Sequence, residues 1–340
     1  MIRDNDLVAA TAGRAFWILD DISTIQQNAN FNSISVPTII TPKYAYKYGA
    51  GNGLPEKEAT IGQNAPEGVI IDYYLPKLGE KDTLHLSIIT DKGKTIRSYT
   101  NIEDAIFKKY PGGPSAKTKL SDNEGHNRFL WDFRTDDLSP DVNGAFVLGS
   151  YSGYAVPPGK YKAQLKYKKE MVETNVTVLP NPNIKVTDLD WQEQQLLLEN
   201  ISATISNIHT TVNNLRGIKK QLQFYSETLG KIETAKVITS AADSLIKKID
   251  TWETAIIESR TQNGQDVINW PSKLNVDFFH LKGLIDVTDP KVTQGVKNKL
   301  ADLQLQWKNE KEKVQGINTA VAEFNALYKN TSIEAIQNKW

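Results

Sequence analysis

Residues 176–195 read VTVLPNPNIKVTDLDWQEQQ, and this stretch decides the fold because the sequence changes character within it. Val176 and Val178 end a run in which β-branched residues occupy every second position, which is typical of a strand with one buried face. Pro180-Asn181-Pro182 then ends the strand. We therefore expect a β region before residue 183 and a different architecture after it.

After Asn183, glycine and proline become sparse and the apolar residues take a helical period. Asp190 followed by Glu193 resembles the capping box that opens a helix. Four helices are expected: one from about Asp190 to a stop at Gly230, one over 235–256, a short one around Phe278, and one that has Pro290 at its first position. Long helices joined by short breaks pack antiparallel, so residues 183–340 are predicted to form a helical bundle.

Residues 69–182 alternate as half-buried strands do. The expected strands are Val69–Leu75, Leu84–Ile88, Thr95–Tyr99, Asn127–Phe133, Tyr161–Tyr167 and Val172–Val178. Gly93 supplies the positive φ for the tight turn between the second and third of them. Short strands without intervening helices predict an antiparallel sandwich. It is interrupted by a polar, mobile loop at 101–125 and a second insert at 135–156.

The N-terminal part is predicted to hold one hairpin. Leu7–Ala10 and Ala15–Leu19 flank Gly13-Arg14 and resemble two short strands around a tight turn. A lone hairpin is marginally stable in water, so we expect it to pack on the rest of the chain or to pair with another chain. Residues 31–68 are rich in Pro, Gly, Asn and Tyr and are predicted to be irregular coil on a surface.

The composition narrows the possible functions. A chain of 340 residues exceeds the usual size of one domain. Lys and Arg number 40 and balance 40 Asp and Glu, so no excess charge favours nucleic acid or an anionic membrane as a partner. No apolar run is long enough to suggest a membrane span. The absence of cysteine excludes disulfides and cysteine nucleophiles, and the N-terminal residues lack the pattern of a signal peptide.

Six segments, taken in order, resemble one bacterial family. They are Asn5–Ile22 (NDLVAATAGRAFWILDDI), Gly62–Gly68 (GQNAPEG), Ile71–Leu75 (IDYYL), Asn127–Arg134 (NRFLWDFR), Pro158–Tyr161 (PGKY) and Lys273–Asp277 (KLNVD). The first resembles the closing segment of the sortilin-like, BNR-repeat β-propellers of bacteria, often labelled glycosyl-hydrolase-like. The others resemble the region that follows the propeller. One residue departs from the family: such segments commonly carry His before Gly-Arg, whereas Ala12 stands here, so no polar role is carried over to it.

The resemblance implies a periplasmic or secreted protein and an Ig-like sandwich similar to that of flagellar hook-capping proteins. The resemblance would divide the chain into four parts: a remnant of a propeller-blade hairpin at 1–30, an irregular linker at 31–68, an Ig-like β-sandwich at 69–182 and a helical bundle at 183–340. It implies no demonstrated activity, because the hydrolase label derives from similarity to the propeller.

Two kinds of residue could serve catalysis or metal binding. Asp132, Asp136, Asp137 and Asp141 are close in sequence, and a glycosidase needs two carboxylates that flank the bond. A strand end followed by a solvated loop is the stronger interpretation. His85, His126, His209 and His280 lack the HxxxH or HxH spacing of a metal site.

Two further patterns favour structural interpretations. Ser139, Asp141, Asn143 and Gly144 resemble the first half of a calcium loop, but Ser150 stands where a bidentate Glu should close it. A glycine-rich surface loop is therefore expected. Trp131 and Tyr161 could line a sugar platform, yet alternating aromatic residues in sandwich strands are usually core.

We therefore predict a non-catalytic structural and interaction module, with no catalytic, cofactor-binding or metal-binding residues. Its partner would be a protein or its own propeller, and a glycan is a further candidate. One alternative is an accessory carbohydrate-binding module, which should expose a planar aromatic patch on the sandwich. The other is part of a glycoside hydrolase whose active site lies in a separate propeller.

Overall fold

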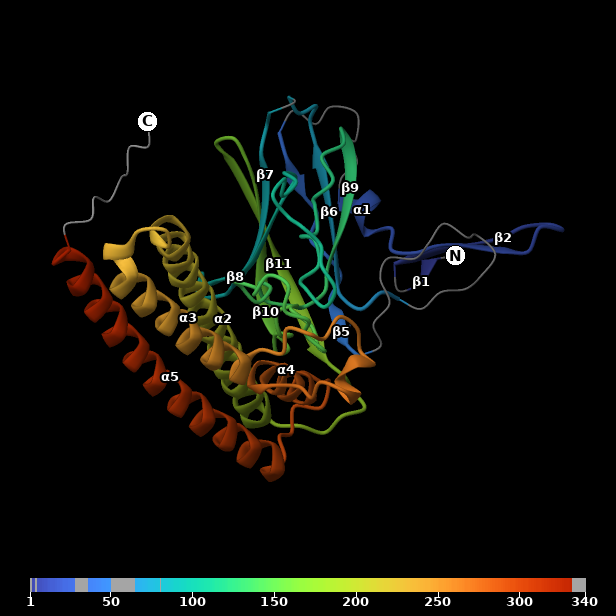
Figure 1. Cartoon of the computed structure of the whole chain (residues 1–340). Helices are drawn as coiled ribbons and strands as arrows, with labels where there is room; N and C mark the ends of the chain where they lie inside the picture. Colours follow the sequence, from blue (N-terminus) through green and yellow to red (C-terminus); the bar gives the residue numbers. More distant parts are fainter. Residues whose placement is uncertain (1, 4, 28–35, 50–64, 80, 332–340) are drawn as a thin grey trace.

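The structure is a computed structural model that describes residues 2–3, 5–27, 36–49, 65–79 and 81–331. It is a mixed α and β fold in which three sheets come first in the chain and a region of long helices follows (Figure 1). The predicted linker and the end of the predicted helical bundle lie partly outside the described residues. The part of the linker outside them includes Gly62–Asn64, the start of the segment Gly62–Gly68 that resembles the family.

Two of the three sheets contain all six strands predicted over 69–182. One sheet has the order β5-β11-β10-β7-β8 and the other the order β4-β6-β9. Neighbouring strands are antiparallel except β5 and β11, which run parallel. The strands are β4 Thr38–Ile39, β5 Ala45–Lys47, β6 Val69–Leu75, β7 Leu84–Thr90, β8 Thr95–Thr100, β9 Gly125–Trp131, β10 Gly159–Tyr167 and β11 Glu170–Pro180.

These two sheets share one hydrophobic core. Side chains alternate across a strand, so every second residue of each sheet turns toward the other sheet. Tyr73 and Trp131 from β6 and β9 are fully buried together with Leu86 and Leu165 from β7 and β10. The Trp131 and Tyr161 rings lie 5.5 Å apart between centroids. Both aromatic residues are therefore core, as predicted, and neither can be a sugar platform.

The predicted linker is not wholly irregular, because it supplies the short strands β4 and β5. Thr38–Ile39 pairs with β6 in one sheet. Ala45–Lys47 pairs with Val178–Pro180 of β11 in the other. Strands of two and three residues are too short to show a period in the sequence, so only their distant partners reveal them.

The long helices lie close to their predicted positions. They are α2 Asp188–Leu229, α3 Lys236–Ile256, α4 Leu274–Ile285 and α5 Gln294–Lys329, with the short helix α1 at Ser23–Gln27 and single 3₁₀ turns at Glu233–Ala235 and Asp266–Ile268. Figure 1 shows α2, α3 and α5 side by side, with contacts between α2 and α3 and between α3 and α5. No helix among the described residues is long and apolar enough to cross a membrane.

Two predicted helix starts are wrong. The capping box of α2 joins Thr187 and Asp190, because the Thr187 hydroxyl accepts from Asp190 N while Asp190 accepts from Thr187 N. The helix therefore begins before the Asp190–Glu193 pair. Helix α5 begins after Thr293, whose hydroxyl accepts from Val296 N, so Pro290 precedes the helix. In both cases a threonine supplies the N-cap oxygen.

The second insert is not a surface loop. We call residues 134–156 the wedge segment, because its apolar side chains enter the hydrophobic core of the helices. Val142, Ala145, Val147 and Tyr151 are buried there with residues of helices α2, α3, α4 and α5. Within the segment, Gly153 approaches its own chain closely, since an added Cβ would lie 2.1 Å from the Thr135 carbonyl oxygen. The sheets and helices thus meet through a segment whose apolar residues follow no period.

Candidate functional site

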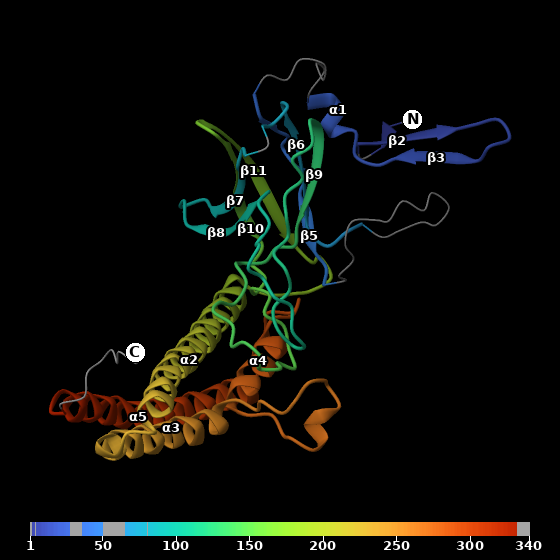
Figure 2. The same ribbon diagram turned by 45° about the horizontal axis from the view of Figure 1, so that its top comes forward.

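The predicted N-terminal hairpin forms and extends away from the rest of the molecule. It consists of β2 (Asp6–Ala10) and β3 (Phe16–Leu19), with β1 (Ile2–Arg3) paired to β2. Figures 1 and 2 both show the hairpin projecting from the sheets, on the side away from the helices. No other described element covers it in either view.

Both faces of this hairpin are apolar. Cross-strand partners share a face, and the pairs are Leu7 with Leu19, Val8 with Ile18, Ala9 with Trp17, and Ala10 with Phe16. One face therefore carries Trp17 and Leu19, and the other carries Phe16 and Ile18. Phe16 is 75% exposed, Ile18 63% and Trp17 59%. This surface differs from that of an ordinary soluble hairpin, which keeps one polar face.

The base of the hairpin is attached to the sheets. Ile22 N donates to Asn5 O at 2.7 Å, and Asp21 N donates to Asp6 Oδ1 at 2.9 Å. Helix α1 follows, and its Gln27 side chain donates to Thr41 O at 2.9 Å and accepts from Thr41 N at 3.0 Å. The base is thereby fixed to the chain that leads into β5, while the apolar strands are left in solvent.

A buried charge cluster, which we call the Asp286 joint, connects the wedge segment to α4. The Arg134 guanidinium donates to Asp286 Oδ2 at 2.6 Å, and Ala155 N donates to Asp286 Oδ1 at 3.0 Å. Lys282 Nζ lies 3.9 Å from the same carboxylate and donates to Ser152 O at 2.7 Å. The Asp286 and Lys282 side chains are only 7% and 4% exposed.

Lys47 brings the edge strand β5 into the same cluster. Its Nζ donates to Val156 O at 3.1 Å and lies 4.8 Å from the centre of the Trp191 ring on α2. Burial lowers the pKa of Lys47 to about 8, although the Asp286 carboxylate opposes the shift. Burial also lowers the pKa of Lys282. The cluster therefore holds Arg134, Lys282 and Lys47 around one aspartate.

His209 of α2 makes a second polar contact with the wedge segment. Its Nδ1 lies 2.7 Å from Pro140 O, and its Nε2 lies 2.8 Å from Asn275 Oδ1 of α4. The ring stacks on Phe279 and is fully buried. Burial lowers the pKa of His209, against the effect of the two oxygen neighbours. This histidine is enclosed by its own chain and has no open side for a ligand.

The four aspartates considered as catalytic carboxylates all contact their own chain. Asp137 pairs with Arg97 of β8 at 3.0 Å, and Asp132 lies 3.5 Å from the same guanidinium. Asp136 accepts from Ser98 N at 3.2 Å, and Asp141 accepts from the Tyr110 hydroxyl at 2.7 Å. An arginine thus stands between Asp132 and Asp137, where a glycosidase would place the sugar.

The four histidines considered as metal ligands lie on four different elements. His85 lies on β7, His126 on β9, His209 on α2 and His280 on α4. His126 Nε2 lies 2.9 Å from Asp72 Oδ1, which also receives a hydrogen bond from Arg128. The residues resembling a calcium loop lie in the wedge segment, where Asn143 O accepts from Arg216. No group of three or more His, Cys, Asp or Glu that could hold a metal ion occurs in the described part of the chain.

No protein-family model matches this chain, and neither a curated protein nor a solved structure matches it.

Proposed function

We propose that this protein is a non-catalytic structural and interaction module, the C-terminal part of a periplasmic or secreted sortilin-like, BNR-repeat propeller protein. The proposal rests on one observation, the exposure of large apolar side chains on both faces of the β2–β3 hairpin. In the proposed assembly this hairpin supplies strands to a propeller blade. The sheets and helices then form a rigid extension beside the propeller.

The two apolar faces are what a blade requires. Each blade of a propeller packs between two neighbouring blades, so both faces of its sheet are buried. A hairpin that merely covered one sheet would need only one apolar face. Phe16 and Ile18 on one side and Trp17 and Leu19 on the other would contact the two neighbouring blades.

The body attached to the hairpin supports a structural role. Its two sheets share a core and would constitute the Ig-like sandwich that the family resemblance implies. The Asp286 joint and His209 bind the wedge segment to α2 and α4 through hydrogen bonds. Such a joint would hold the helices at a fixed angle to the sheets, so that a partner bound to the helices would be positioned relative to the propeller.

Hydrogen exchange of the hairpin amides tests the proposal. The chain is measured alone, at low and high concentration, and again after addition of a BNR-repeat propeller that lacks the strands of its closing blade. We expect rapid exchange over residues 6–19 in the chain alone and slow exchange with the propeller. Replacing Phe16 and Trp17 together by Ser should abolish the protection, because it places a polar group on each face.

A matched control is Ile106→Ser, since Ile106 is 87% exposed but lies in the loop that follows β8. That variant should be protected by the propeller as the unaltered chain is. Slow exchange in the chain alone at every concentration would mean that the hairpin docks on its own chain. Protection that grows with concentration would mean that it pairs with a second copy. Either result contradicts the proposal, as does rapid exchange in the presence of the propeller.

A further inference from the structure

Three tyrosines form an aromatic ridge on the edge strand of the five-stranded sheet. Tyr44, Tyr46 and Tyr48 occupy every second position of the segment that contains β5, so they lie on one face of it. The ring centroids of Tyr44 and Tyr46 are 5.6 Å apart, and those of Tyr46 and Tyr48 are 5.4 Å apart. The intervening Ala45 packs on the core of the sheets, and Lys47 is buried, so the tyrosines face outward.

The two end residues of the ridge are open to solvent, unlike the aromatic residues in the core of the two packed sheets. Tyr44 is 51% exposed and Tyr48 is 50% exposed, whereas Trp131 and Tyr161 are 0% and 7% exposed. Tyr46 lies between the two end residues and is half-buried, so the ridge offers aromatic ring surface and hydroxyl groups chiefly through Tyr44 and Tyr48. None of the three belongs to the core that the two sheets share, which leaves the cluster as a candidate contact surface.

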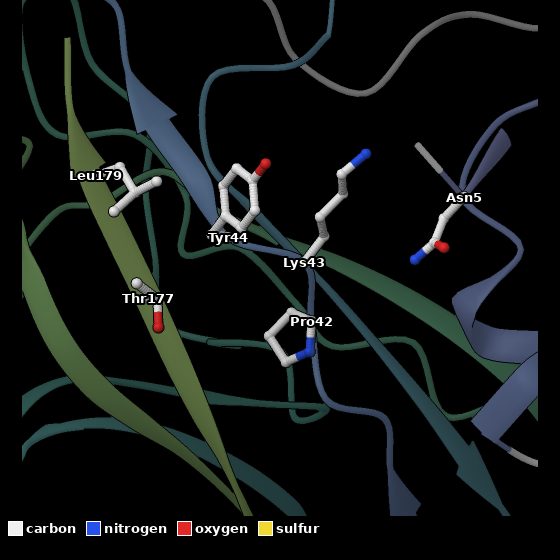
Figure 3. A pocket seen from close by; sticks show the side chains of 6 residues that line it. All are labelled: Asn5, Pro42, Lys43, Tyr44, Thr177 and Leu179. Atoms are coloured by element: carbon white, nitrogen blue, oxygen red, sulfur yellow. The ribbon is translucent and has the colours of Figure 1, made fainter. Parts of the chain in front are cut away.

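A hollow of about 500 Å³ adjoins the ridge at Tyr44. Its lining is mixed: Pro42 and Leu179 are apolar, whereas Asn5, Lys43 and Thr177 carry hydrogen-bonding groups. Figure 3 shows Thr177 and Leu179 on β11, the Tyr44 ring beside Leu179, and Asn5 on the opposite side of the space. Asn5 belongs to the base of the hairpin, where its carbonyl oxygen accepts from Ile22 N.

We infer that the tyrosine ridge and the adjoining hollow form a binding site for a neutral oligosaccharide. Pyranose rings have apolar C–H faces and a rim of hydroxyl groups, so they need aromatic surface together with hydrogen-bond donors and acceptors. The ridge supplies the aromatic surface, and Asn5, Lys43, Thr177 and the tyrosine hydroxyls supply the polar groups. A few convergent polar groups beside apolar surface are typical of a small-molecule site.

The angles between the tyrosine rings indicate which kind of glycan the ridge could bind. The planes of Tyr44 and Tyr46 are inclined by 87°, and those of Tyr46 and Tyr48 by 39°. Rings set at such angles cannot lie flat on a crystalline polysaccharide surface. They suit a single soluble chain whose successive sugars turn relative to one another. Among the described residues that line the hollow there is no carboxylate, and the inference concerns binding of the glycan alone.

Affinity electrophoresis of the whole chain tests this site, with gels that contain soluble neutral polysaccharides: xylan, glucomannan, laminarin or hydroxyethyl cellulose. A glycan array of neutral oligosaccharides provides the second measurement. We expect retardation by at least one polysaccharide. Tyr44→Ala should weaken that binding by about tenfold, as removal of a central aromatic contact does. Thr177→Val should weaken it less, because it removes one hydroxyl while the β-branched shape remains.

Two controls separate this site from other exposed aromatic surfaces. Phe224→Ala removes a side chain that is 61% exposed on α2, and Trp17→Ala removes one from the hairpin. Both variants should be retarded as the unaltered chain is, and circular dichroism should show all variants folded. Absence of binding in the gels and on the array would overturn the inference, and so would retardation that Tyr44→Ala and Tyr48→Ala leave unchanged.

A third outcome would assign the ridge to a different partner. If the chain sediments as a dimer, binds no glycan, and becomes a monomer on Tyr44→Ala, then the ridge is a contact between copies and the inference is wrong. The Trp17→Ala control also keeps this test independent of the proposed propeller contact, because the hairpin and the ridge are altered separately.

Discussion

The β2–β3 hairpin and the Asp286 joint differ in which side chains they expose and which they bury. The hairpin leaves Phe16, Trp17 and Ile18 largely in solvent, although burial of each would be favourable. The joint encloses Asp286 and Lys282, although burial of each charge alone would be unfavourable. In the part of the chain that the structure describes, one region exposes its apolar groups, and the other has charges that its own chain surrounds.

The difference indicates where the chain is complete by itself. Buried charges remain in a fold only when partners and hydrogen bonds compensate for the lost water, and each charge of the joint has such partners within the chain. Among the described residues, the large apolar groups on both faces of the hairpin stay exposed. The joint is therefore satisfied by contacts within the chain, whereas the exposed surface of Phe16, Trp17 and Ile18 is what the proposed propeller contact would bury.

Removal of the carboxylate at the joint should have the largest effect. Asp286→Ala removes the carboxylate that accepts from Arg134 and lies beside the buried amines of Lys282 and Lys47, and Ala155 N loses its acceptor. We expect the free energy of unfolding to fall by about 4–5 kcal/mol, measured by urea denaturation.

Asp302→Ala is the matched control, because Asp302 is an exposed carboxylate on α5. It should change the free energy of unfolding by no more than about 0.5 kcal/mol. If the two variants were equally stable, the joint would contribute no more than a surface carboxylate does, and the contrast with the hairpin would disappear.

Two tryptophans provide a second comparison. Trp131 is fully buried between the sheets, and Trp17 is 59% exposed on the hairpin. Trp131→Ala should lower the free energy of unfolding by about 3–5 kcal/mol, because it leaves a cavity in the core. Trp17→Ala should change it by no more than about 0.5 kcal/mol. An equal loss for both variants in urea denaturation would show that the hairpin is packed in solution.

The smallest expected effect is the pH dependence that Lys47 introduces. Its pKa is about 8 in the folded protein and 10.5 when unfolded. Below pH 8 the amine is charged in both states, so its burial opposes folding. Between these two pKa values the unfolded state binds more protons, so the stability contributed at Lys47 rises with pH.

Lys47→Met removes this titration. The free energy of unfolding of the unaltered chain should therefore rise relative to that of Lys47→Met by about 2–3 kcal/mol as pH increases from 8 to 10.5. Lys94→Met is the control, since Lys94 is 75% exposed and should show no such change relative to the unaltered chain. A difference that stayed constant with pH, or that fell, would contradict burial of a charged Lys47 in solution.

Local patterns in the sequence determined the regular elements of this protein. Alternation located β6 to β11, because side chains of a strand point to opposite faces. Steps of three and four located α2 to α5, and Gly230 stands directly after α2 as predicted. The hairpin was also predictable from a local pattern, because two apolar runs flank a turn. The alternation of Tyr44, Tyr46 and Tyr48 was also present in the sequence, but nothing local distinguishes an exposed ridge from a buried one.

Only the tertiary structure decided how these elements are joined. The strands β4 and β5 exist because β6 and β11 supply their hydrogen-bond partners. The wedge segment has no period, so its burial depends on the helices that it contacts. Arg134 and Asp286 are 152 residues apart in the chain. A buried ion pair forms where folding brings opposite charges together and excludes water, and a sequence pattern records neither the distance nor the exclusion.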